Sequence, residues 1–177
     1  MANNRELRFI HSPRTAGTSI RHALGLKGAA DHSTLDDLRR KLGIEELEKL
    51  FTFTVVRNPY ARLVSYCWLY RRSKEKFDHF VRAVAANGIT ASIMCSQVSR
   101  ISLDGIIRVN KILRFDTLAD QWRSFARDFG LPSTLEHKNA IDHPPWQSFY
   151  TKELADIVYK TYEEDFEMLG YRREIDE

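Results

Sequence analysis

The chain has 177 residues, 43% of them hydrophobic and 29% charged, with a formal net charge of +3. This length fits one domain with a core of its own, so we expect a single domain over residues 1–177. No apolar run reaches the roughly 20 residues that cross a bilayer, and no apolar secretory signal opens the chain, so we expect a soluble, cytoplasmic protein. The charge is too small to indicate nucleic acid as a partner.

In the first half of the chain, strand patterns alternate with helical ones. Aromatic and β-branched residues predict strands over residues 7–11 and 51–56. Apolar residues at helical spacing predict helices over residues 18–24, about 33–43, and 61–72. Ser33 or Thr34 is the expected N-cap of the second helix, and Gly43 is its expected end.

The second half continues in the same way. Helices are predicted around residues 77–84, from Asp116 or Thr117 to about Phe129, and over about Lys152–Tyr162, while residues 105–115 read as one or two strands. Residues 89–103 fit no single pattern. Strands that alternate with helices are typical of an α/β fold, in which helices cover both faces of a mainly parallel sheet.

The stretch SPRTAGTS, Ser12–Ser19, joins the first predicted strand to the first predicted helix. A tight turn at a helix N-terminus gathers free backbone N–H groups, which suit a phosphate group. Gly17 allows a close backbone approach, and the guanidinium of Arg14 suits phosphate oxygens. The loop lacks the Walker A lysine, which argues against an ordinary ATP or GTP site. Taken alone, it is also explained by a hydroxyl-capped helix with a surface arginine.

A second stretch, FTFTVVRNPYARLVSY, places Arg57 directly after a buried strand and Ser65 about two turns into the next helix. Open α/β sheets bind ligands beyond the carboxyl ends of their strands. Arg57 and Ser65 are therefore candidates for a second phosphate site. The alternatives are a structural ion pair for Arg57 and a hydroxyl bonded to its own helix for Ser65.

These two stretches carry a family resemblance. FIHSPRTAGTSI resembles the 5′-phosphosulfate loop of sulfotransferases, and TVVRNPYARLVSY resembles their 3′-phosphate motif. The likeness is closest to the branch of carbohydrate sulfotransferases and their small bacterial relatives. It extends through ILRFDTL and the tail SFYTKELADIVYKTYEEDFEMLGY, so that it covers nearly the whole chain.

The resemblance implies a P-loop-like, three-layer α/β fold and 3′-phosphoadenosine 5′-phosphosulfate (PAPS) as the sulfuryl donor, with no metal. It implies that Arg57 and Ser65 hold the 3′-phosphate, and that the 5′ side is held by Pro13, Arg14, Thr15, Ala16, Gly17, Thr18 and Ser19. Much of this branch has lysine where Arg14 stands. A guanidinium stays protonated, so the expected catalytic role of Arg14 is to neutralise charge on the leaving group rather than to donate a proton.

Transfer to a hydroxyl also needs a base, and near neutral pH this is most simply a histidine. Among six histidines, His32 lies between the two phosphate motifs, in the stretch HSTLDDLR. This stretch resembles the connecting region in which several members of the branch carry a catalytic histidine. His32 is therefore the expected general base. The alternative is a polar residue that merely precedes a helix.

The acceptor side is less defined by the sequence. The resemblance points to the segment LEHKNAIDHPPW, in which His137, Lys138 and Asn139 are secondary candidates for substrate binding. Trp146, Phe149 and Tyr150 are candidates either for an acceptor wall or for the core.

The sequence thus predicts a sulfotransferase acting on a carbohydrate or another small alcohol. Two alternatives stay open: a P-loop-type phosphotransferase, and a nucleotide-binding module without turnover.

Overall fold

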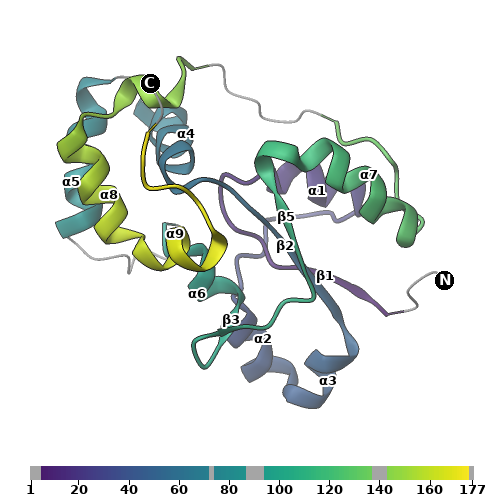
Figure 1. Ribbon diagram of the computed structural model, residues 1–177. Helices are drawn as coiled ribbons and strands as arrows, with labels where there is room; N and C mark the ends of the chain where they lie inside the picture. Colours follow the sequence, from purple (N-terminus) through teal and green to yellow (C-terminus); the bar gives the residue numbers. More distant parts are fainter. Residues whose placement is uncertain (1–4, 72–73, 87–93, 137–142, 176–177) are drawn as a thin grey trace. The chain divides into compact units, whose positions relative to one another are not determined.

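The computed structural model describes residues 5–71, 74–86, 94–136 and 143–175 (Figure 1). The chain divides into two compact units. The first unit comprises Met1–Val56 and Ser99–Asn139, and the second comprises Arg57–Val98 and Ala140–Glu177. No helix in the described ranges is long and apolar enough to cross a bilayer.

The first unit is built on a three-stranded parallel sheet. Its strands are β1 (Leu7–Phe9), β2 (Phe51–Val56) and β5 (Lys111–Arg114), in the order β1-β2-β5. Phe9 lies opposite Phe53, and Val56 lies opposite Arg114. β2 is the central strand, and it is buried from Thr52 to Val56 because both of its edges are paired and both of its faces are covered.

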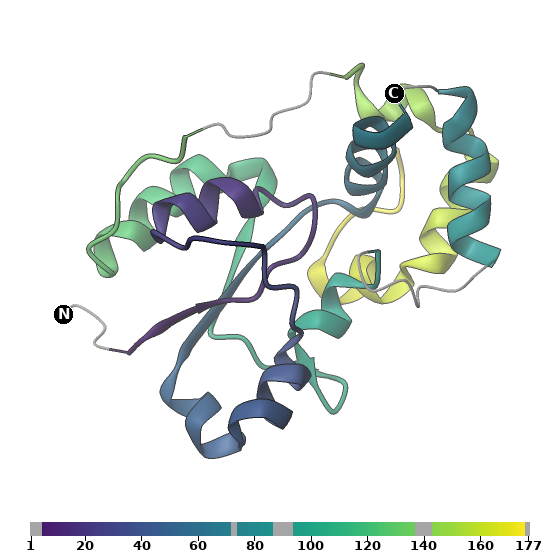
Figure 2. The same cartoon turned by 180° about the vertical axis from the view of Figure 1, so that it is seen from behind.

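Two helices, α1 (Gly17–Ala23) and α7 (Leu118–Asp128), lie side by side over one face of this sheet, as Figures 1 and 2 show from opposite sides. Phe53 and Val55 of β2 point to this face, since alternate strand residues share a face. They belong to a buried cluster with residues from β5 and both helices: Ile20, Leu113, Leu118, Trp122, Phe125 and Ala126. The aromatic rings of Phe53 and Phe125 lie 4.6 Å apart.

The opposite face carries α2 (Leu35–Leu42), α3 (Ile44–Lys49) and the two-stranded hairpin of β3 (Ser102–Leu103) and β4 (Ile106–Ile107). A recess of about 700 Å³ is lined by Thr52 of β2 together with Leu35, Leu47 and Leu103. Thr34 caps α2, because its hydroxyl accepts from the Asp37 N–H while the Asp37 carboxylate accepts from the Thr34 N–H.

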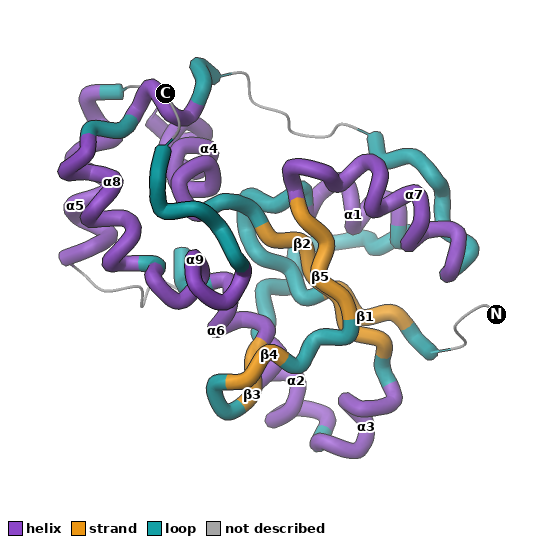
Figure 3. Tube along the Cα trace, viewed as in Figure 1, coloured by secondary structure: helices purple, strands orange, loops and turns teal. Residues whose placement is uncertain are grey.

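The second unit is mainly helical (Figure 3). It contains α4 (Pro59–Arg71), α5 (Glu75–Ala86), a short 3₁₀ turn at Trp146–Phe149, α8 (Lys152–Thr161) and α9 (Glu163–Leu169). Its core joins all of these elements through residues that include Tyr60, Leu63, Phe77, Val81, Phe149, Leu154, Val158 and Phe166. A further helix, α6 (Gln97–Ile101), begins in this unit and ends in the first.

The predicted α/β fold, with a central parallel sheet flanked by helices, is confirmed. The strand over residues 51–56 and the helix over residues 33–43 were well placed. Outside residues 89–103, two helices were missed. α3 follows α2 after Gly43, which was expected only as an end, and α9 follows α8 directly at Glu163. The expectation of a single domain stays a prediction.

Candidate functional site

The loop between β1 and α1 passes through two left-handed residues. Arg14 has a φ of 69° and Ala16 a φ of 63°, and the buried Thr15 between them donates its hydroxyl to the carbonyl of Ser12 at 2.5 Å. Left-handed residues in a tight loop can turn successive backbone N–H groups toward one side, which makes a concave anion site. For residues other than glycine this conformation costs on the order of 1–3 kcal/mol each, and such strain clusters at functional sites.

The donor set of this loop fits an anion. Residues 9–23 contain no carboxylate, so no charge in this stretch repels a phosphate or sulfate group. Arg14 is half-buried and the Thr18 side chain is exposed at the start of α1. The Ser12 hydroxyl is buried and has no hydrogen-bond partner among the described residues. The remaining predicted loop residues are buried or half-buried: Pro13, Thr15, Ala16, Gly17 and Ser19.

His11 packs directly against the start of α1. A Cβ atom placed on Gly17 would lie 1.8 Å from His11 Nε2, which is far inside contact distance. The close approach that Gly17 allows is therefore an approach of the His11 ring within the chain. His11 is itself buried, and its Nδ1 has no hydrogen-bond partner in the described part of the chain.

The structure brings His32 to this loop. The imidazole of His32 stacks on that of His11, with ring centroids 4.7 Å apart and an interplanar angle of 27°. Phe9 of β1 also stacks on His11, with the two ring centroids 5.5 Å apart. Two residues separated by 21 positions thus lie together, and His11 connects the predicted base to the predicted phosphate loop. His32 is exposed to solvent, as a group that must meet a substrate requires.

Three arginines hold the segment that leads to His32. Arg100 of α6, itself buried, donates to the backbone carbonyl of His32 at 2.8 Å. Arg8 of β1 forms an ion pair with Asp31 at 2.5 Å. Arg21 of α1 donates to the carbonyl of Gly28 at 3.0 Å. The position of His32 is therefore fixed from β1, α1 and α6.

The same surroundings keep both imidazoles neutral. Burial, and after it the nearby His32, Arg100 and Arg21, together lower the pKa of His11 to about 3. Partial burial of the ring, and then Arg100, also lower the pKa of His32, although the carboxylate of Asp31 opposes this. A neutral imidazole at neutral pH can accept a proton, which a general base must do.

The other predicted phosphate residues belong to the second unit. The chain leaves β2 at Val56, and Arg57 follows as a half-buried residue. Asn58 then caps α4, since its side-chain oxygen accepts from the Tyr60 N–H at 2.9 Å, and Pro59 takes the first helical position. Ser65 lies in α4 and is only 3% exposed.

Sequence reasoning missed two residues that hold the candidate groups in place. Arg100 anchors His32, and Gln97 hydrogen-bonds to the backbone of Arg57. Both lie in α6, within the range that fitted no pattern. No local signal marks them, because their partners are 68 and 40 positions away. His137, Lys138 and Asn139 lie outside the described residues, and their role stays a prediction.

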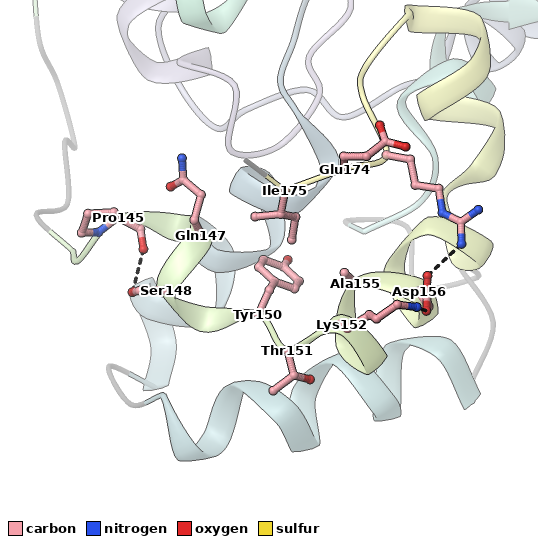
Figure 4. Close-up of a pocket in the computed structure, with 11 residues that line it drawn as sticks. Pro145, Gln147, Ser148, Tyr150, Thr151, Lys152, Ala155, Asp156, Glu174 and Ile175 are labelled. Atoms are coloured by element: carbon pink, nitrogen blue, oxygen red, sulfur yellow. Dashed lines mark hydrogen bonds and ion pairs between the residues drawn. The ribbon is translucent and has the colours of Figure 1, made fainter. Parts of the chain in front are cut away.

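A second concavity of about 780 Å³ lies in the second unit (Figure 4). Tyr150, Ala155 and Ile175 give it apolar walls, whereas Phe149 is part of the core. Three of its charged groups pair with one another, as Asp156 accepts from Lys152 at 3.1 Å and from Arg173 at 2.9 Å. Neither Arg57 nor Ser65 lines it, so it is separate from the predicted phosphate residues.

Comparison with known proteins identifies the family. The model of the Sulfotransferase family matches residues 5–172, which is nearly the whole chain and includes both phosphate motifs and His32. No curated protein and no solved structure matches the chain. On the extent of this match, the protein belongs to the sulfotransferase family, whose members transfer a sulfuryl group.

Proposed function

We propose that the protein transfers a sulfuryl group from PAPS to a hydroxyl of a carbohydrate or another small alcohol. The observation that supports this best is the stacking of His32 on His11, beside a loop with two left-handed residues and no carboxylate. An anion-binding loop and a neutral base in one place are what transfer to a hydroxyl requires.

The loop residues Pro13–Ser19 would hold the 5′ side of the donor. Backbone N–H groups around Arg14 and Ala16, together with the exposed Thr18 hydroxyl, supply donors for its oxygens. The guanidinium of Arg14 neutralises charge that develops on the leaving phosphate, and it keeps its own proton throughout. When bound, PAPS supplies the activated sulfuryl group.

Arg57 and Ser65 would hold the 3′-phosphate. A guanidinium binds phosphate oxygens with a fixed, forked geometry, so it suits a group that distinguishes PAPS from most nucleotides. A donor recognised at two separate phosphates is held in one orientation, which favours in-line attack by the acceptor oxygen.

His32 would accept the proton of the acceptor hydroxyl. Its lowered pKa keeps it neutral at pH 7, and the hydrogen bond from Arg100 to its backbone carbonyl fixes its segment. His137, Lys138 and Asn139 are proposed to contact the acceptor, because they resemble the segment that lies near donor and acceptor in the family.

Calorimetry with the product nucleotide tests this proposal. Adenosine 3′,5′-bisphosphate (PAP) should bind more tightly than ATP, and Arg57→Ala should weaken PAP binding by about 2 kcal/mol or more, as expected when a charged hydrogen bond is lost. Tighter binding of ATP would instead indicate a phosphotransferase.

A transfer assay with PAPS and pooled glycans, phenols and sterols separates the enzyme from a silent module. The enzyme yields a sulfated product, whereas a silent module binds PAP and yields none.

A further inference from the structure

The side chain of Gln97 forms hydrogen bonds with both backbone polar groups of Arg57, the N–H and the carbonyl. Its Nε2 donates to the Arg57 carbonyl at 2.8 Å, and its Oε1 accepts from the Arg57 N–H at 2.9 Å. Gln97 is fully buried. β2 ends one residue earlier, so the sheet ladder that holds Val56 does not continue to Arg57. The amide of Gln97 therefore supplies the hydrogen bonds for the Arg57 backbone that a neighbouring strand supplies within the sheet.

Asp165 of α9 fixes the orientation of this amide. Its buried carboxylate accepts from Gln97 Nε2 at 3.2 Å, from the backbone N–H groups of Gln97 and Val98 at 2.9 Å each, and from the Ser96 hydroxyl at 2.6 Å. A carboxylate only accepts. A reversed amide would set Gln97 Oε1 against both this carboxylate and the Arg57 carbonyl, so only one orientation satisfies all partners.

The buried charge of Asp165 is compensated locally. Arg62, also buried, has its Nη1 4.0 Å from Asp165 Oδ2 and donates from the same nitrogen to the carbonyl of Cys95 at 3.0 Å. Several donors around one carboxylate offset the cost of removing it from water. The result is a network of buried polar side chains that connects α9 to Arg57, the residue after β2.

We infer that Gln97, held by Asp165, is a positioning residue that sets the backbone of Arg57 for binding the 3′-phosphate. The inference rests on the proposed function, since it takes Arg57 as the ligand of that phosphate. Fixing the backbone fixes the direction in which the side chain leaves it. A guanidinium that is already positioned before the phosphate binds loses less conformational entropy on binding.

The test compares two nucleotides that differ at one group. PAP carries the 3′-phosphate and adenosine 5′-phosphate (AMP) does not. In the wild type, PAP should bind more tightly than AMP. Gln97→Met removes the amide while keeping a chain of similar length. It should weaken PAP binding about tenfold, which corresponds to roughly 1.4 kcal/mol, and should leave AMP binding within about twofold.

Gln121→Met is the matched control. Gln121 also bonds to backbone at the end of a strand, since its Oε1 accepts from the N–H of Arg114, the last residue of β5, at 2.9 Å. Its Nε2 donates to the Thr117 hydroxyl at 2.7 Å. It lies in α7 of the first unit, and the same substitution there should leave the ratio of AMP to PAP dissociation constants unchanged. In an Arg57→Ala background, Gln97→Met should cause no further loss of PAP affinity, because the positioned group is already gone.

The outcomes separate positioning from a purely structural role. If Gln97→Met leaves the ratio of the AMP to the PAP dissociation constant unchanged, either because both bind equally more weakly or because neither changes, the inference is overturned. Should the methionine variant fail to fold in thermal unfolding, Gln97→Asn keeps the amide but is one methylene too short to span both atoms of Arg57, and its ratio must also fall. A wild type that binds AMP as tightly as PAP overturns the 3′-phosphate site itself, and the inference falls with it.

Discussion

The rings of His11 and His32 are stacked, although His11 lies two residues after β1 and His32 lies shortly before α2. His11 is held on its other sides by Phe9 and by the start of α1 at Gly17. His32 is therefore placed by the same residues that shape the loop. A substitution in the loop that displaces His11 should therefore also displace the imidazole of His32.

Removing the imidazole of His32 should abolish proton transfer while leaving donor binding intact. We expect His32→Ala to lower kcat by roughly 100-fold or more, since general bases contribute about 10²–10⁴-fold. The dissociation constant for PAP, measured by calorimetry, should change little. His79→Ala is the control, because His79 is an exposed residue of α5, and its kcat should match the wild type. Normal turnover of His32→Ala would assign the base to another residue.

The pH profile should report the charges around His32. The base must be neutral, and its pKa is lowered, so kcat/KM should decline only below pH 6.5. Arg100, Arg21 and the neighbouring His11 surround it together with Asp31. Asp31→Asn removes the charge that raises the pKa and should move the acidic limb to lower pH, whereas Arg100→Met should move it to higher pH.

A remote carboxylate checks that the shift is local. Asp120 of α7 is exposed and pairs with Arg123. Asp120→Asn should leave the acidic limb where it is in the wild type. Shifts of the same sign in the Asp31 and Arg100 variants would contradict an electrostatic origin.

Two adjacent substitutions in the loop should have different effects on stability. Gly17→Ala drives a Cβ into the His11 ring and should lower the free energy of unfolding by about 1–3 kcal/mol, as overpacking does. Ala16→Gly places glycine at a φ of 63°, which glycine adopts without strain, so stability should stay within about 1 kcal/mol of the wild type. Urea unfolding measures both. A stable Gly17→Ala protein would mean that His11 can move aside.

His11 should make the fold sensitive to mild acid. Its pKa is about 3 in the folded chain, against 6.5 for an unburied histidine. Between these values the unfolded chain binds a proton that the folded chain does not, so stability is complete above pH 6.5 and falls as the pH decreases. For this one proton, the free energy of unfolding falls by at most about 1.4 kcal/mol for each pH unit. His11→Asn should be less stable at pH 7 but should lose less on going to pH 5, which urea unfolding at the two values tests.

The sequence revealed the parts of the fold that local patterns encode. β2 is an uninterrupted run of aromatic and β-branched residues, and α2 has a hydroxyl N-cap, apolar residues at helical spacing and a glycine at its end, so each was found from its own residues. α9 was missed because its pattern runs on from α8 without a glycine or proline between them. The hydroxyl-rich loop around Gly17 could be recognised because its residues are contiguous in the sequence.

The supporting residues could not be found in this way. Nothing near Arg100 indicates that it bonds to the carbonyl of residue 32, and nothing near Gln97 indicates that it holds residue 57. Each bond joins segments that only the completed tertiary structure brings together. His11 directly precedes the loop in the sequence, but its contact with Gly17 depends on how β1 and α1 are packed.

The bonds from Asp165 to Gln97 and Val98 also bear on how the chain is made. A nascent chain exposes residues 57 and 97 long before residue 165 has left the ribosome, so the amide of Gln97 has no carboxylate to orient it during most of synthesis. Until α9 emerges, the segment around Arg57 lacks its mature support, and a polypeptide cut off before that helix never acquires it.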